Sequence, residues 1–165
     1  MKHLALKTLL AVVALTISVT AKAERLFSEL AGQAGVESVY VGKSMVGMAK
    51  GLLGQSGDKD ALIARNAIKN IDSIEIISCE HHPGDIRKVQ TAARKIMSRL
   101  KLEVLVETRE DEEEVTIYGL PSKKNPAEIS DMIIESYEPE EYSLVHISGS
   151  IDINAITAEN KSAKK

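Results

Sequence analysis

The feature that most restricts the fold of this chain is a change in hydrophobic period after residue 101. There Leu102, Val104 and Val106 are predicted to point one way and Glu103 and Glu107 the other, and Val115 and Ile117 repeat this pattern after the acidic turn Glu110–Glu114. Two further strands are predicted at Glu128–Ser136 and Tyr142–Ser148. Because successive side chains of a strand point to opposite faces, these four strands predict an antiparallel sheet with one apolar face.

The earlier part of the chain alternates between helical and strand periods. Ile71–Cys79 is its most apolar stretch and predicts a central strand that is covered on both faces. Gly149 is expected to close the last strand, and Ile151–Ala158 to form a final helix. The remaining predicted elements are helices at 24–34, 44–53, 58–70 and 83–101 and a strand at 36–41.

The helix at 83–101 has the strongest amphipathic pattern. Its apolar stripe consists of Ile86, Val89, Ala93, Ile96, Met97 and Leu100. A sheet with one apolar face and helices with one apolar stripe can bury each other in two layers. We therefore predict an α+β fold, with an antiparallel-rich sheet and amphipathic helices mainly on one face. The predicted single domain spans residues 24–159, and a flexible tail follows at 160–165.

The first 23 residues have the three parts of a secretory signal peptide. Lysines supply positive charge, a largely apolar run without charge covers Thr8–Thr20, and Ala21 and Ala23 place small residues at the cleavage site. A membrane-spanning helix needs about 20 apolar residues, so the run is too short for an anchor. We predict that Met1–Ala23 is removed and that the mature protein is exported, periplasmic or secreted, without a transmembrane anchor.

Composition narrows the classes of partner. The net charge of the chain is −3, and it becomes −6 once Lys2, Lys7 and Lys22 leave with the signal peptide. A net acidic protein has no general attraction for nucleic acid. The absence of Trp, together with one Phe and four Tyr, leaves few flat surfaces on which bases or sugars stack. Cys79 is the only cysteine, so no internal disulfide can form.

The segment Cys79–His82 contains side chains that zinc and copper prefer, a thiol and two imidazoles. A structural zinc site has four converging ligands, whereas neighbours on an extended chain point to opposite sides, and His146 could join only through the fold. The alternative is a buried free cysteine that ends a core strand. We expect no metal and no other cofactor. The acidic turn Glu110–Glu114 likewise lacks the glycine and the ligand spacing of a calcium loop.

Six basic residues lie along the predicted helix at 83–101. At about 100° per residue they fall opposite the apolar stripe, on an otherwise acidic protein. The pattern indicates a surface for an acidic protein or a small anionic partner, and an ordinary solvated helix face is the alternative. The candidate partner-binding residues are Arg87, Lys88, Arg94, Lys95, Arg99 and Lys101.

The helix at 44–53 is rich in methionine. Met45, Met48 and Leu52 recur at helical spacing. A docking groove or a membrane contact is one interpretation of these adaptable side chains. Packing against the sheet is the other, and we expect it, because methionine commonly fills gaps in cores.

The chain carries no Gly-x-Ser-x-Gly elbow, phosphate loop or dinucleotide fingerprint. We therefore expect a non-enzymatic binding or regulatory module. The alternative is a small metal-binding protein or enzyme that uses Cys79, His81 and His82.

The order of features resembles one known family. The segments that carry the resemblance are Arg25–Phe27, Gly35–Val41, Ile71–Ile77, Val115–Tyr118 and Leu144–Asp152. Together they resemble the bacterial envelope family catalogued as domain of unknown function 4252, most specifically in the final strand with its Gly-x-Ile-Asp turn. The resemblance implies a small exported protein of Gram-negative bacteria. That family has no established catalytic residues, so the resemblance assigns none here.

Overall fold

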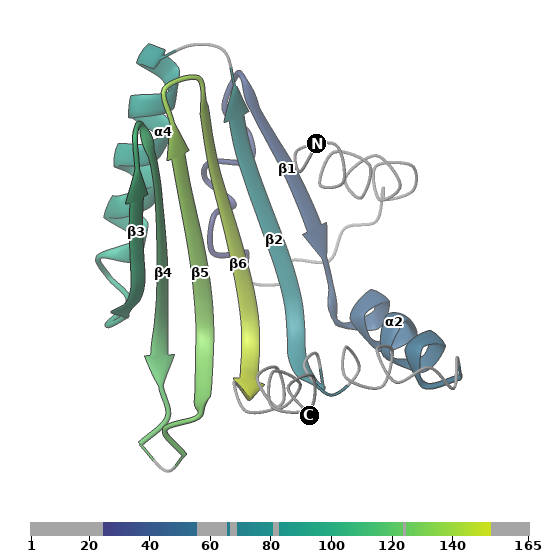
Figure 1. The fold of residues 1–165 in the computed structure, drawn as a ribbon. Helices are drawn as coiled ribbons and strands as arrows, with labels where there is room; N and C mark the ends of the chain where they lie inside the picture. Colours follow the sequence, from purple (N-terminus) through teal and green to yellow (C-terminus); the bar gives the residue numbers. More distant parts are fainter. Residues whose placement is uncertain (1–24, 56–65, 67–68, 81–82, 124, 153–165) are drawn as a thin grey trace.

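The computed structural model describes residues 25–55, 66, 69–80, 83–123 and 125–152. Within them, six strands form one antiparallel sheet in the order β1-β2-β6-β5-β4-β3 (Figure 1). The strands are β1 (Val36–Val41), β2 (Asn70–Glu80), β3 (Glu103–Glu110), β4 (Glu113–Pro121), β5 (Glu128–Glu138) and β6 (Glu141–Asp152). The described helices are α2 (Lys43–Gln55) and α4 (Pro83–Met97). The predicted α+β class with an antiparallel sheet is confirmed.

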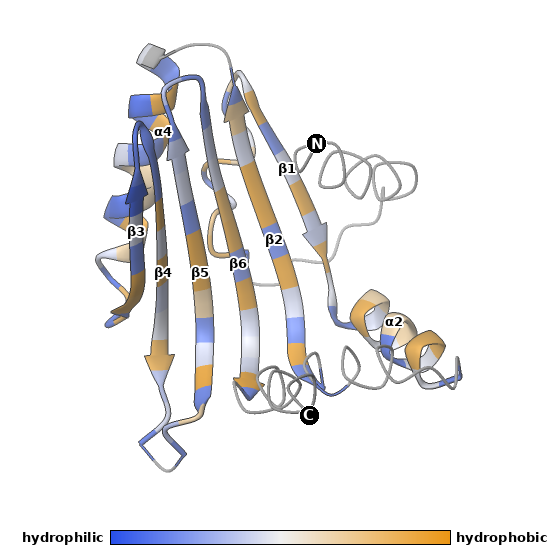
Figure 2. Cartoon of the chain, viewed as in Figure 1, coloured by the Kyte–Doolittle hydropathy of each residue, from blue (hydrophilic) through white to orange (hydrophobic). Residues whose placement is uncertain are grey.

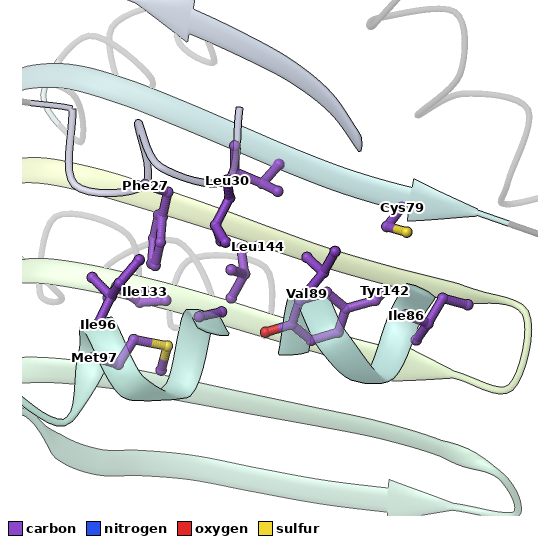
Figure 3. Packing of buried hydrophobic residues seen from close by; sticks show 12 residues of the cluster. Phe27, Leu30, Cys79, Ile86, Val89, Ile96, Met97, Ile133, Tyr142 and Leu144 are labelled. Carbon is purple, nitrogen blue, oxygen red and sulfur yellow. The ribbon is translucent and has the colours of Figure 1, made fainter. Parts of the chain in front are cut away.

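One face of the sheet is covered by α4 and by residues 25–35, which lie behind the sheet in Figure 1. Alternate residues of β2, β5 and β6 point to this face and pack against the apolar stripe of α4. The stripe is buried as predicted, and Leu100 packs at its edge. The core comprises Phe27, Leu30, Ile77, Cys79, Ile86, Val89, Ala93, Ile96, Met97, Ile133, Tyr142 and Leu144 (Figure 3).

The opposite face is covered only at one end in the described part of the chain. There Val46 of α2 packs on Ile71 and Ile151. Further along β2, Ile76 stays partly exposed while Ile77, its neighbour on the covered face, is fully buried. Among residues 25–55, 66, 69–80, 83–123 and 125–152, therefore, this strand is not covered on both faces as predicted, because α4 supplies a long apolar stripe to one face and α2 supplies a single buried residue to the other.

The exposed side chains of α2 correct a second prediction. Met45, Met48 and Leu52 are 48%, 62% and 69% exposed, so they do not pack in the core. At 100° per residue these three side chains share one side of the helix, about 120° away from Val46. Because Val46 faces the sheet, the methionine side faces away from it.

Residues 26–35 form successive turns rather than the helix predicted at 24–34. The N–H of Leu30 donates to the carbonyl of Phe27 (2.9 Å), and that of Gln33 donates to Leu30 (3.0 Å). These bonds span three residues, as in tight turns. The N–H of Phe27 donates to the carboxylate of Glu75 on β2 (3.1 Å), which holds the segment against the sheet. The apolar spacing identified the buried side chains but not the backbone conformation.

The last strand is longer than predicted. Gly149 does not close it, and Ile151 and Asp152 continue β6 where a final helix was expected. Gly149 has φ 111 and lies in an irregular part of the β2–β6 pairing, where the register shifts between Ile71 and Ser73. A glycine followed by a polar residue therefore marks a bulge here and not a strand end.

The other helix boundaries also differ from the predictions. α4 ends at Met97 and not near residue 101, and residues 98–100 form a turn. The signal peptide at 1–23, the tail at 160–165 and residues 153–158 of the final helix lie outside the described residues. Most of the helix predicted at 58–70 does too, although Asn70 itself begins β2. None of the described helices has the length and apolarity to cross a membrane.

Candidate functional site

A cavity of about 480 Å³ lies on the covered side of the sheet, where the chain leaves α4. Its volume falls within the range of about 300–1,000 Å³ that is typical of small-molecule sites. Its apolar walls are Leu26, Leu100, Leu102 and Leu120. Its polar groups are Arg25, Lys101, Asp131, His146 and Ser148.

Irregularities in two strands shape this cavity. Register shifts occur between Tyr118 and Leu120 in β4 and between Ser130 and Met132 in β5. Asp131 lies at the second of these register shifts. Its φ angle is 49°, a left-handed conformation that non-glycine residues rarely adopt. Aspartate adopts this conformation more readily than most residues, in turns and bulges and also at functional sites. Here the bulge brings the Asp131 carboxylate to 3.8 Å from Nε2 of His146.

His146 is a buried histidine in the wall of the cavity. His146 is 8% exposed. Its ring contacts the Phe27 ring edge-on, with the two ring centroids 6.2 Å apart. Burial lowers the pKa of His146 below its ordinary value, and the nearby Asp131 carboxylate only partly opposes this. The imidazole is therefore neutral at neutral pH.

Glu75 lies opposite His146 in the β2–β6 pairing and is 2% exposed. Its Oε2 accepts the Phe27 N–H, and its Oε1 has no hydrogen-bond partner among the described residues. Burial raises the pKa of this carboxyl, against the opposing hydrogen bond from Phe27 and the charge of Arg25. Sequence reasoning missed this residue, although the alternation of Glu75 with Ile77 and Cys79 on one face of β2 could have indicated it.

Two positively charged side chains, Arg25 and Lys101, line the cavity. The guanidinium carbon of Arg25 lies 4.5 Å from the centroid of the Tyr40 ring, an arrangement that orients the Arg25 side chain. Lys101 is exposed on the segment that follows α4. The cavity thus joins leucine walls to two positive charges, the Asp131 carboxylate and a neutral imidazole.

A second polar cluster is centred on Glu135, which is 2% exposed in β5. Its Oε1 accepts hydrogen bonds from Arg94 Nε (3.0 Å) and the Tyr142 hydroxyl (2.9 Å), and its Oε2 accepts one from the Tyr118 hydroxyl (2.9 Å). Burial and the Glu135 charge raise the pKa of Tyr118 to about 12 and raise that of Tyr142 further. The Glu135 carboxylate therefore links β4, β5 and β6 to α4.

The structure places the six predicted partner-binding residues in different surroundings. Arg87, Lys95 and Arg99 are exposed. Lys88 is also exposed and pairs with Asp85 at 3.1 Å. Lys101 lines the large cavity.

Arg94 departs from the predicted basic face. It bends toward Glu135 and lines a smaller cavity of about 350 Å³ beside Tyr118. Burial alone would lower its pKa, but the hydrogen bond and charge of Glu135 raise it overall. Helical spacing could not predict this, since a buried acid on another element attracts the side chain.

The residues considered for metal binding do not converge in the described part of the chain. Cys79 is 1% exposed in the core, and burial raises the pKa of its thiol. It pairs with Tyr142, four residues before His146 on β6, so the two candidate ligands are about 13 Å apart along the sheet. His81 and His82 lie outside the described residues. No group of three possible ligands lies together within the described ranges.

The neutral imidazole predicts a pH dependence of stability. In the unfolded chain His146 titrates near 6.5, and in the fold its pKa is lower, so acid favours the unfolded state. We expect this contribution to be complete above about pH 6.5 and to be lost as the pH falls, by about 1.4 kcal/mol per unit of pKa difference. Urea unfolding at about pH 7.5 and about pH 5.5 should show a larger loss for the wild type than for His146→Gln. Equal losses would contradict a lowered pKa.

Comparison with protein families finds one match, described as a domain of unknown function (DUF4252), over residues 27–158. The match covers most of the chain, including all six strands, α4 and the residues that line the cavity apart from Arg25 and Leu26. No curated protein and no solved structure matches the chain.

Proposed function

The chain belongs to the family described as a domain of unknown function, DUF4252, and since that description names no activity, we propose a function from the cavity itself. The protein is an exported, non-enzymatic binding module of the bacterial cell envelope. It holds a small anionic ligand with an apolar body. The observation that carries this proposal is the cavity of about 480 Å³ that joins four leucines to Arg25 and Lys101.

The arrangement of the polar groups favours an anion. Arg25 and Lys101 offer hydrogen-bond donors and two positive charges against the single Asp131 carboxylate, and the neutral His146 adds no charge. The leucines offer only dispersion and hydrophobic contact, which suit a hydrocarbon chain. A carboxylate with an alkyl body matches both parts.

Binding without catalysis is supported by the spacing of the cavity's polar residues. Ser148, His146 and Asp131 are the residue types of a hydrolytic triad. However, the acidic partner of His146 in this cavity is Asp131, whose Oδ1 lies 3.8 Å from Nε2. Within the described residues no hydrogen bond joins the Ser148 hydroxyl to His146. A serine without a bonded base is a weak nucleophile.

Export to the envelope rests on the N-terminal pattern. Residues 1–23 combine positive charge, an apolar run and small residues at the cleavage position. An intact mass of protein from the envelope fraction that begins near Glu24 would support this part of the proposal, and an uncleaved cytoplasmic chain would overturn it.

Decanoate is a suitable probe for the cavity, because it has one carboxylate and a flexible alkyl chain. Titration calorimetry should show saturable binding at a single site. The Arg25→Gln/Lys101→Gln variant should bind decanoate at least about tenfold more weakly, since hydrogen bonds to charged groups contribute about 1.5–3 kcal/mol. Decanol, which lacks the charge, should bind the wild type weakly and should not distinguish it from the variant.

Arg87→Gln/Lys95→Gln is the matched control, because both residues are exposed on α4 and neither lines the cavity. It removes the same charge and should leave decanoate binding unchanged. Equal weakening by both variants would show a general charge effect rather than a site. No saturable binding of decanoate by the wild type would overturn the proposed function.

A further inference from the structure

A row of apolar residues crosses the whole sheet on the face opposite α4. It takes one residue from each strand, and each is paired directly with the next. The row is Val39, Ile76, Val145, Ile134, Ile117 and Val106. Figure 2 shows the hydrophobic segments in the middle of β2, β6 and β5. We call the side of the sheet that bears this row the open face.

The open face is unoccupied at this row in the described part of the chain. All six side chains are at least partly exposed, and Val106 is 47% exposed. α2 and its buried Val46 reach only the end of the face near Ile71 and Ile151. A continuous apolar surface of this width is typical of an interaction site.

The residues beside the row allow another surface to approach closely. The adjacent row contains Ser78, Ser143 and Ser136, which are directly paired across three neighbouring strands. Serine side chains are short and uncharged, so they add little height to the sheet. A row of glutamates follows, with Glu138 paired to Glu141.

We propose that the open face is the contact surface of a homodimer in which two copies of this chain pack face to face. Six strands about 4.8 Å apart and three exposed rows about 7 Å apart give an area of roughly 600 Å² per copy. A dimer would bury about 1,200 Å², the lower end of a standard stable interface. The row is uncharged and apolar, so it is complementary to itself, as a twofold contact requires.

The distribution of charge selects one orientation of the two copies. Glu138 and Glu141 lie at one end of the open face, next to the exposed turn residues Asp111 and Glu112. The opposite end carries the exposed Lys69, together with Lys43, which pairs with Asp72 at 3.0 Å, and Lys50, whose ammonium donates to the Ile71 carbonyl. A twofold axis perpendicular to the strands separates the two acidic ends and brings each one toward the lysines of the other copy.

Sedimentation equilibrium of the mature chain tests the proposal. The wild type should approach twice the monomer mass with a Kd in about the micromolar range, as expected for a small interface. Ile134→Lys places a charge at the centre of the row and should weaken the dimer at least about tenfold. Ser143→Arg should do the same by holding the two sheets apart, and it replaces no apolar residue, so folding is not at risk.

Thr91→Lys is the control, because Thr91 is exposed on α4 behind the sheet. It should leave the dimer intact, as should Arg25→Gln/Lys101→Gln, since the dimer does not depend on the proposed ligand. A wild type that stays monomeric would overturn the proposal, whether a segment of the same chain or a different protein covers the face. A dimer that survives both Ile134→Lys and Ser143→Arg would also overturn it.

Discussion

Replacing Glu135 with alanine is expected to lower the free energy of unfolding by about 3 kcal/mol. Breaking a buried ion pair costs about 3–5 kcal/mol, and the half-exposed Arg94 can partly return to solvent, which favours the lower value. The Tyr142 hydroxyl loses its acceptor in the core, where an unsatisfied donor is costly. Urea unfolding followed by circular dichroism measures the change.

Glu140→Ala is the control for this prediction. Glu140 is exposed in the turn between β5 and β6, so its loss should change the free energy of unfolding by less than about 0.5 kcal/mol. If Glu135→Ala cost no more than Glu140→Ala, the carboxylate would not hold the two tyrosines and Arg94 together.

Gly149→Ala is expected to destabilise the protein by more than about 3 kcal/mol. A Cβ atom at this position would collide with the backbone of the neighbouring strand, first with the carbonyl oxygen of Asn70. The φ of 111 adds strain for any residue other than glycine. Backbone atoms of β2 cannot move aside without breaking the pairing between the two strands. Thermal unfolding should show the loss directly.

Gly47→Ala is expected to stabilise the protein in the same thermal unfolding experiment. Gly47 lies in α2, and nothing comes within 4 Å of a Cβ built there. Alanine should therefore stabilise the helix by about 0.5–1 kcal/mol, because glycine loses more conformational entropy on folding. Similar losses from both substitutions would mean that the Gly149 bulge imposes no special constraint.

The parts of the fold that follow from local pattern were predictable. β1 was predicted at its observed bounds, and the apolar stripe of α4 was identified residue by residue. The predictions that were wrong concern features that depend on contacts between segments far apart in the sequence. The turn segment at residues 26–35 is fixed by Glu75, which lies 48 residues beyond Phe27. The bulge at Gly149 depends on its pairing with β2, which no local period reveals.

The candidate site was largely beyond sequence reasoning for the same reason. Lys101 was selected as a basic residue, but the cavity that it lines also takes residues from the N-terminal segment and from β4, β5 and β6. Asp131 enters only because β5 bulges at its position. Cys79 and His146 are both possible metal ligands by residue type, but the register places them in different parts of the same face.

The buried thiol of Cys79 can be used to measure local opening of this fold. Cys79 is 1% exposed beneath α4, and the raised pKa of its thiol keeps the reactive thiolate scarce. An added thiol reagent therefore reaches Cys79 only when the helical layer lifts from the sheet. With a single cysteine in the chain, the labelling rate reports one event and needs no engineered probe. Cys79 is thus a natural probe of local opening. The free energy of that opening can be compared with the free energy of global unfolding.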